Sequence, residues 1–351
     1  MSAVRILAYD ESDRARVLAL FASQDRAELS ALWTWKYEQK PTLASHRARI
    51  FLAEVDGDLV GILASMPYDA WVEDRLVRIQ HATDLLVHAD HRQRGIGSKV
   101  TGAYIEQTPM SFSWQNPGSR AAARHHTSQL GWEIPWLVQP LDASALVARV
   151  TKSRALARAA SLVARGFAGF TRHAAPRDDS VSVEQVEQVP ADVDDLERRA
   201  RARIPALLAR NRDVLRWRYF ERPGMRYTVV SATRAGACCG YAVMRVIDHA
   251  GAPWAHLLDY LVDPDDAGAL AALVGDVAAR ARAAGAVALR CIASLPAFRR
   301  TLIRCGFMPW PSRRPGWFLV RDDSHDPAHA LLRRRSAWHF THGDGDAELS
   351  L

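Results

Sequence analysis

A short glycine-containing segment after an apolar run could bind a pyrophosphate. The run LLV at 85–87 is followed closely by RQRGIGS at 92–98, where a helical pattern begins. Glycines allow a tight turn and a close approach of the backbone to a ligand. The N-terminus of the following helix would add unpaired N–H groups and the positive end of its dipole. The segment therefore predicts a pyrophosphate cradle built from backbone amides.

Two other phosphate-binding motifs fit this segment less well. A Walker A loop ends in Gly-Lys-Ser/Thr, whereas Ser98 separates Gly97 from Lys99 here. A dinucleotide-binding fingerprint needs a third glycine at the position of Val100. Neither nucleotide-binding motif is favoured.

The four cysteines are not expected to carry chemistry. They form no Cys-x-x-Cys pair and have no His-rich ligand spacing around them, which disfavours both a zinc site and a disulfide scaffold. The adjacent Cys238 and Cys239 lie in an apolar run, where buried strand thiols are typical. The sequence predicts no metal cofactor.

An internal repeat organises the chain. The segment WKYEQKP at 35–41 recurs as WRYFERP at 217–223, and HATDLLVHAD at 81–90 recurs as HLLDYLVDPD at 256–265. The Gly-Trp pair at 131–132 has its counterpart in Gly-Phe at 306–307. Landmarks in the same order predict a tandem duplication.

Each copy is predicted to be an α+β unit, with a mixed, mainly antiparallel sheet flanked by helices. Helical periodicity covers 11–24 and 191–210, and Asp56-Gly57 is a strong hairpin signal between two strands. A glycine-rich turn then opens a helix over 95–107, and the second copy has a helix over 267–284. These elements place the predicted cradle at the end of a central strand.

The repeat divides the chain into four predicted parts. Residues 1–142 form the first domain, 143–185 a basic linker helix, 186–322 the second domain and 323–351 a partly ordered tail. The apolar residues of the linker share one helical face, which indicates a helix packed on a domain. Contact of residues 150–172 with an anionic membrane surface is the alternative interpretation.

The composition is that of a globular protein. Of 351 residues, 48% are hydrophobic and 24% are charged, and the length favours two domains. No run of about 18 apolar residues and no signal peptide is visible, so we expect a soluble, cytoplasmic protein. The formal charge of +7 suits an anionic cofactor. We expect no nucleic-acid partner, and the oligomeric state stays open.

The segment 84–100 resembles the acetyl-coenzyme A motif of the GNAT superfamily of N-acetyltransferases. The pattern Arg/Gln-x-x-Gly-x-Gly/Ala after a strand ending in Val is met by Arg92, Gly95 and Gly97 after Val87. The resemblance covers residues 1–140 strongly and 186–320 in outline. It implies two tandem GNAT-like domains, of which the second is degenerate, because AGALAA at 267–272 keeps one glycine and no arginine.

The resemblance implies which residues bind acetyl-coenzyme A. Backbone amides from Arg94 to Ser98 would hold the pyrophosphate, and the strand 85–87 would pair with the pantetheine arm. The N–H near Leu85 or Leu86 would face the acetyl carbonyl and stabilise its developing charge. The cofactor-binding residues expected in this way are Leu86, Val87, Arg92, Gln93, Arg94, Gly95, Ile96, Gly97, Ser98 and Asn116.

The resemblance leaves the proton-transfer groups open. The position of the family's acidic tyrosine is Thr127, so His125 or His126 is the candidate acid. His81 is the first candidate base, because alternation places it on the strand face of Thr83, Leu85 and Val87, and Asp84 is the second. The recurrence of both residues in the second copy, as His256 and Asp259, favours a structural role instead.

The implied reaction is direct attack of a primary amine on the thioester in a ternary complex. A small amine or an amino sugar is the preferred acceptor, as in GNAT proteins of bacterial polysaccharide biosynthesis, and protein lysine or N-terminal acetylation is the alternative. A non-catalytic module that senses acyl-coenzyme A is the alternative of another class, because the acidic tyrosine is missing.

Overall fold

The chain forms two compact units. The computed structural model describes residues 3–127, 131–146, 175–249, 251–310, 317–323 and 326–345. Unit 1 consists of Met1–Glu133 and Gly316–Arg333, and unit 2 of Ile134–Pro315 and Arg334–Leu351. Within the described residues, no helix is long and apolar enough to cross a membrane.

Unit 1 is built on a mainly antiparallel sheet. Its strand order is β1 (Val4–Ala8), β2 (Arg49–Val55), β3 (Asp58–Val72), β4 (Arg75–Val87), β5 (Met110–Gln115), β15 (Trp317–Asp322) and β6 (Trp132–Glu133). The β4–β5 pair is parallel and the other neighbours are antiparallel. Asp56 and Gly57 connect β2 to β3 with φ values of 53° and 91°, which confirms the predicted hairpin.

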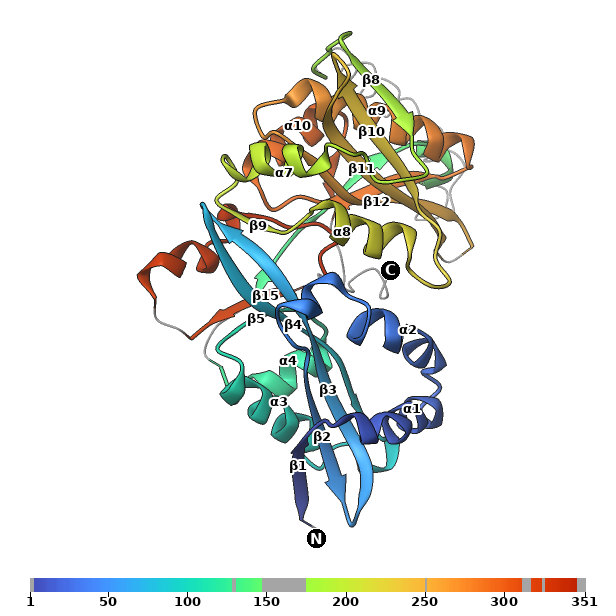
Figure 1. The fold of residues 1–351 in the computed structure, drawn as a ribbon. Coiled ribbons are helices and arrows are strands. Elements are labelled where there is room, and N and C mark those ends of the chain that lie inside the picture. The colour runs from blue at the N-terminus through green and yellow to red at the C-terminus, as the bar shows by residue number, and fades with distance from the viewer. Residues whose placement is uncertain are drawn as a thin grey trace. The chain divides into compact units, whose positions relative to one another are not determined.

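Helices cover both faces of this sheet (Figure 1). α1 (Arg14–Ser23) and α2 (Ala27–Tyr37) lie on one face, and α3 (Ile96–Gln107) and α4 (Pro117–Ala123) on the other. Val100 and Tyr104 of α3 pack on Phe51 of β2 and Leu63 of β3. Short 3-10 turns cover Glu11–Asp13, Pro41–Ala44, Ala89–His91 and Pro327–Arg333.

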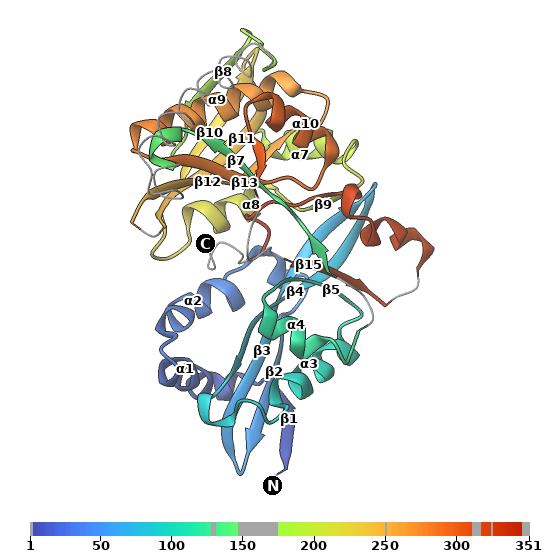
Figure 2. The ribbon, with the colours of Figure 1, turned by 180° about the vertical axis from the view of Figure 1, so that it is seen from behind.

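Unit 2 repeats this plan (Figure 2). Its strand order is β8 (Val181–Gln185), β10 (Thr228–Arg234), β11 (Ala237–Asp248), β12 (Pro253–Val262), β13 (Ala288–Ile292), β7 (Trp136–Pro140) and β14 (Met308–Trp310). Only β12 and β13 run parallel in this order. The short strands β9 (Ala206–Leu208) and β16 (Trp338–His339) pair with each other in parallel.

The helices of unit 2 also follow the order of unit 1. Among the described residues of unit 2 they include α7 (Val193–Arg201), α8 (Arg212–Leu215), α9 (Ala267–Ala283) and α10 (Pro296–Arg304), with a π-helical turn at Arg216–Phe220 and a 3-10 turn at Arg335–Ala337. α9 is the counterpart of α3, because each helix follows the fourth strand of its sheet order. The two helix-flanked sheets confirm the predicted α+β fold class.

One strand from each half of the sequence completes the sheet of the other unit. β7 comes from the first half and lies between β13 and β14, whereas β15 comes from the second half and lies between β5 and β6. The predicted boundaries, 1–142 and 186–322, therefore differ from the compact units. A sequence repeat shows which segments correspond, but it does not show which copy a strand pairs with.

The predicted linker and tail also differ from the structure. Residues 181–185 of the predicted linker form the edge strand β8, and residues 147–174, which include most of the predicted basic helix, lie outside the described residues. In the predicted tail, Trp338 and Phe340 are 0% exposed. Their indole and phenyl rings stack with centroids 4.5 Å apart, so hydrophobic burial orders this part of the tail.

Candidate functional site

The parallel strands β4 and β5 separate in the middle of unit 1. Gln80 pairs with Ser111 and His81 pairs with Phe112. Both strands are fully described, and no later residue of β4 pairs with β5. The backbone of residues 85–87 in β4 therefore lies beyond the paired region. An extended ligand can add to such a strand edge through main-chain hydrogen bonds.

A β-bulge lies at the point where the strands separate. Ile62 of β3 pairs with Leu86, but Ala64 pairs with Thr83, so Asp84 and Leu85 together stand opposite one residue of β3. Asp84 has a φ of 49°, a conformation that non-glycine residues adopt at a cost. A bulge reorients the neighbouring backbone groups, which is the geometry required to direct an N–H group at a substrate carbonyl.

Helix α2 holds this bulge through the Asp84 side chain. The Asp84 carboxylate accepts hydrogen bonds from Lys36 Nζ at 2.8 and 3.0 Å and from Tyr37 Oη at 2.6 Å. The Lys36 and Asp84 side chains are 1% and 4% exposed. Asp84, predicted as a base, is thus a buried, ion-paired anchor of the strand.

The same contact recurs in unit 2. Asp259 lies beside the bulge of β12 and accepts a hydrogen bond from Tyr219 Oη at 3.0 Å. Tyr219 is the repeat counterpart of Tyr37, and Asp259 that of Asp84. The Tyr–Asp contact therefore belongs to the duplicated fold, and the recurrence of the WxY motif was the signal that could have identified Tyr37.

The predicted cradle is an open helix N-terminus. Gly95 is the N-cap of α3 with a φ of 76° and offers no side-chain cap to the first turn. A Cβ added at Gly95 would meet nothing within 4 Å. The N–H groups at the start of α3 thus face open space, where the helix dipole favours an anion.

Two side chains shape the loop in front of α3. Arg92 Nε donates to the Val87 carbonyl at 3.1 Å, and Gln24 Oε1 accepts from the Ala89 N–H at 2.8 Å. Gln93 adopts a φ of 62° within this loop. Arg92 therefore ties the loop to the end of β4, and Gln24 is a supporting residue that the sequence did not reveal.

The corresponding helix N-terminus in unit 2 is filled by carboxylates. The Asp266 side chain caps α9 by accepting from Ala269 N at 2.9 Å, and Arg234 bridges Asp266 and Asp178 at 2.6 Å each. A Cβ at Gly268 would lie 2.8 Å from Asp178 Cβ. A pyrophosphate would meet two like charges here, so this N-terminus is unsuited to it.

The separated strands of unit 2 are also filled, by residues 338–344, which we name the C-terminal plug. β12 and β13 pair only as far as His256 with Arg290. Beyond this point, Gly343 N donates to the Leu258 carbonyl at 2.7 Å. His339 Nε2 lies 2.7 Å from the Tyr260 carbonyl oxygen. The plug thus lies along β12 at the position that corresponds to the part of β4 beyond its pairing with β5 in unit 1.

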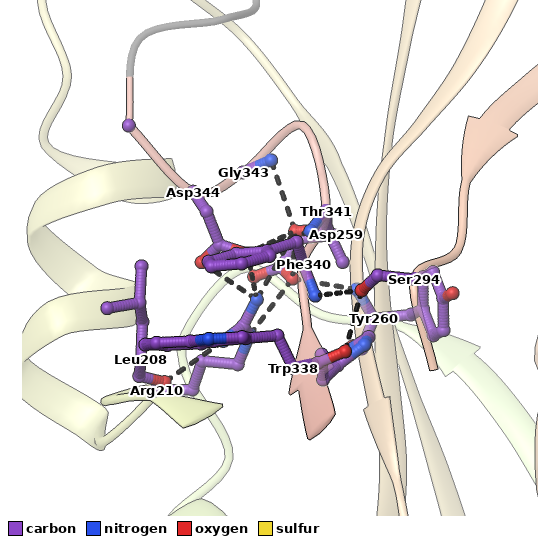
Figure 3. A network of polar contacts seen from close by, with 12 residues as sticks. Leu208, Arg210, Asp259, Tyr260, Ser294, Trp338, Phe340, Thr341, Gly343 and Asp344 are labelled. Carbon is purple, nitrogen blue, oxygen red and sulfur yellow. Dashed lines mark hydrogen bonds and ion pairs between the residues drawn. The ribbon is translucent and has the colours of Figure 1, made fainter. Parts of the chain in front are cut away.

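A buried ionic network fixes the C-terminal plug (Figure 3). Arg210 Nη2 donates to Asp344 at 2.7 Å and Arg210 Nε to Asp259 at 3.1 Å. Burial opposes the charge of Asp259, but Arg210 and the hydrogen bonds from Thr341 and Tyr219 together keep the pKa of Asp259 below its usual range. Burial and the nearby Asp259 raise the pKa of Asp344. Ser294 Oγ adds a neutral contact by accepting from Phe340 N at 2.7 Å.

His81 lies in the aromatic core of unit 1. Its side chain is 0% exposed and stacks on Phe112 with ring centroids 4.6 Å apart. Alternation predicted that His81 shares a strand face with Leu85 and Val87, and this prediction is wrong. The bulge adds one residue at 84–85, so the side chains of His81 and Thr83 lie on the same face as that of Leu86. The structure therefore separates His81 from the strand face on which alternation had placed it.

The remaining predicted residues lie around α3 and α4. Asn116 caps α4, with Oδ1 accepting from Ser119 N at 2.9 Å. His126 Nε2 lies 2.9 Å from Ser98 Oγ, next to the first turn of α3. His125 is exposed and accepts from Arg124 Nε at 2.9 Å. The structure thus brings His126, but not His81, to the predicted cradle.

The described residues contain no group of three or more His, Cys, Asp or Glu side chains placed to hold a metal ion. Burial raises the pKa of Cys291 well above its usual range and that of Cys305 to about 11, so neither thiol forms a thiolate readily at neutral pH.

The chain is similar to known proteins in two ways: a family model matches part of its sequence, and solved structures have a similar fold. Residues 5–134 match the family model of the acetyltransferase (GNAT) domain. No curated protein sequence matches the chain.

Three solved structures illustrate the shared fold. A probable N-acyltransferase from Enterococcus faecalis has a TM-score of 0.62 at 9% identity, with 92% of this chain and 73% of that chain covered. A GCN5-related N-acetyltransferase from Anabaena variabilis has a TM-score of 0.61 at 10% identity, with coverages of 91% and 72%. Saccharomyces cerevisiae N-myristoyltransferase with bound myristoyl-CoA has a TM-score of 0.55 at 11% identity, with coverages of 92% and 82%. Residues 5–134 therefore match a GNAT acetyltransferase domain, and this match supports an acyltransferase activity for the chain.

Proposed function

We propose that the protein transfers an acyl group from acyl-coenzyme A to a primary amine, and that unit 1 alone binds the coenzyme. The contrast between the units carries this proposal. In unit 1 the N-terminus of α3 has no side-chain cap and β4 extends beyond its pairing with β5, whereas carboxylates and the C-terminal plug fill the counterparts in unit 2.

Residues of unit 1 supply binding and positioning in this proposal. The first amides of α3 hold the pyrophosphate, the backbone of 85–87 pairs with the pantetheine arm, and an amide at the bulge stabilises charge on the acyl carbonyl oxygen. The thioester supplies an activated acyl group that the amine attacks directly. Placing the two reactants together provides much of the acceleration.

Proton transfer is assigned to groups with solvent access. His81 is enclosed and Asp84 is ion-paired, so we propose that water removes the ammonium proton. We propose His125 or His126, both exposed after α4, as the acid that protonates the leaving thiolate. We propose a small-molecule amine as the acceptor, as in the GNAT proteins that the sequence resembles.

Calorimetric titration of acetyl-coenzyme A into the full chain tests the coenzyme site, and one site per chain is expected. Gly95→Val should abolish binding, because its side chain enters the space in front of α3. Any L-residue at this φ also costs stability, about 1–2 kcal/mol. The matched control is Gly57→Val, since Gly57 likewise has a positive φ and open space around it.

The outcomes separate the alternatives. Equal loss of stability in the two variants, with loss of binding only in the Gly95 variant, supports the assigned site. Two sites per chain would contradict the assignment of unit 2, and binding without thiol release in an amine screen would indicate a sensing module. Titration with myristoyl-coenzyme A, the ligand of the yeast neighbour, measures the preferred acyl length.

A further inference from the structure

A guanidinium group in unit 2 lies between two indole rings. Arg290 is on β13, and its Cζ is 4.5 Å from the ring centroid of Trp136 on β7 and 5.6 Å from that of Trp254 on β12. The ring of His342, in the C-terminal plug, stacks on the indole of Trp136 with ring centroids 4.3 Å apart. Three strands and the C-terminal plug therefore fix the position of this single side chain.

No acidic side chain neutralises Arg290. Its Nε lies 3.1 Å from both ring nitrogens of His256, and within the described residues it makes no ion pair. Burial, together with the nearby Arg290, lowers the pKa of His256 to about 2 and that of His342 to about 3, so both rings are neutral. Among the described residues, the positive charge of Arg290 thus has no acidic partner, and Arg245, which pairs with His256 across the sheet, adds a second positive charge nearby.

Two other half-buried arginines of unit 2 have carboxylate partners. Arg280 pairs with Asp276 at 2.6 Å, and Arg234 pairs with two aspartates. Burial without such a partner lowers the pKa of Arg290 to about 10, which still leaves it charged at neutral pH. A partly desolvated charge without a counter-charge is costly, and a bound anion removes that cost.

The end of the Arg290 side chain is available to a ligand. Its side chain is only partly buried. Among the described residues, only Nε of Arg290 has a hydrogen-bond partner, so its two terminal nitrogens remain as donors for a ligand. Two parallel N–H donors of this kind match the two oxygens of a carboxylate or phosphate.

We propose that Trp136, Arg290 and Trp254 form a binding site for a small oxyanion-bearing molecule, whose carboxylate or phosphate pairs with the guanidinium end while the indoles contact its flat or apolar part. Aromatic rings on both sides would restrict the ligand to one orientation. The site lies entirely within unit 2 and does not depend on the proposed acyl transfer.

Calorimetric titration and thermal unfolding of the full chain test this site, with benzoate and inorganic phosphate as probes at constant ionic strength. Saturable binding of at least one probe, with a rise in Tm, is expected for the parent protein. Arg290→Met should lower the affinity about tenfold or more, as expected for loss of a charge-assisted pair. Arg280→Met, which removes a half-buried arginine that already has a carboxylate partner, should leave binding unchanged.

The variants also differ without a ligand. Arg290→Met should keep or raise Tm, because it removes an uncompensated charge, whereas Arg280→Met should lower it. Trp136→Leu should weaken benzoate more than phosphate if the indole contacts the flat part of the ligand. The proposal is overturned if neither probe binds saturably. It is also overturned if the Arg290 and Arg280 variants lose affinity for the probe equally.

Discussion

Asp84 is the residue that links the sequence repeat to the geometry of the candidate site. Its positive φ forms the bulge of β4, and its carboxylate is held by Lys36 and Tyr37 of α2. These contacts oppose the backbone strain of the bulge, so the amides of the next residues keep a fixed direction. A residue of this kind acts on the reaction by positioning the strand, not by exchanging a proton.

Tyr37→Phe tests this positioning role at the residue scale. Loss of one hydrogen bond to a charged group should cost about 1.5–3 kcal/mol of stability. It should also lower kcat with little change in the affinity for acetyl-coenzyme A, because the bulge loses one of its anchors. Chemical denaturation and steady-state kinetics with an amine identified in the screen would measure both effects.

The repeat offers a matched control for this substitution. Tyr219→Phe removes the equivalent hydrogen bond to Asp259 in unit 2. It should lower the free energy of unfolding by a similar amount and leave kcat unchanged. A comparable fall in kcat for both variants would indicate a general effect of stability and contradict the positioning role of Tyr37.

At the scale of elements, local features could be predicted from the sequence and long-range pairing could not. The turn at Asp56-Gly57 and the helix start at Gly95 depend on φ preferences of neighbouring residues, which the sequence states directly. The bulge at Asp84 depends on contacts with α2, and it reversed the face expected for His81. Side chains alternate between the two faces of a strand only while its pairing register is unbroken, and a bulge shifts that register.

The C-terminal plug is the element whose role can be tested by one added methyl group. A Cβ at Gly343 would lie 2.2 Å from Tyr219 Oη and 2.8 Å from Asp259 Cβ. Gly343→Ala should therefore displace the plug from β12 and destabilise unit 2, by about 1–3 kcal/mol or more for overpacking. Hydrogen exchange at residues 338–344 should accelerate.

Gly275→Ala is the control for the Gly343 variant. Gly275 lies within α9, and a Cβ there would meet nothing within 4 Å. This substitution should stabilise the helix by about 0.5–1 kcal/mol. Unchanged exchange of the plug in the Gly343 variant would contradict its close packing against Asp259.

For the molecule as a whole, the exchange of strands decides what can fold independently. Phe318 of β15 is 0% exposed and stacks on Phe112 with centroids 5.5 Å apart, next to the ring of His81. The core of unit 1 is thus completed by a strand from the second half of the sequence. The repeat boundaries, which suggested an independent first domain, gave no indication of this dependence.

A fragment of residues 1–142 should therefore fail to fold. It lacks β15, so β5 and β6 would expose unpaired edges, and it carries β7 without its partners. Circular dichroism and thermal unfolding should show no cooperative transition. A fusion of residues 1–133 to 316–333 through a flexible linker should restore one, together with binding of acetyl-coenzyme A, whereas cooperative unfolding of 1–142 alone would contradict the prediction.

The strand exchange also constrains how such a gene can change. Because β7 and β15 each complete the sheet of the other unit, deletion of either half by recombination removes a strand from the half that survives. If recombination moves one repeat into a new gene, the protein encoded there lacks one strand of its sheet. A unit without a coenzyme site would therefore still be inherited, since the other unit depends on it for a strand.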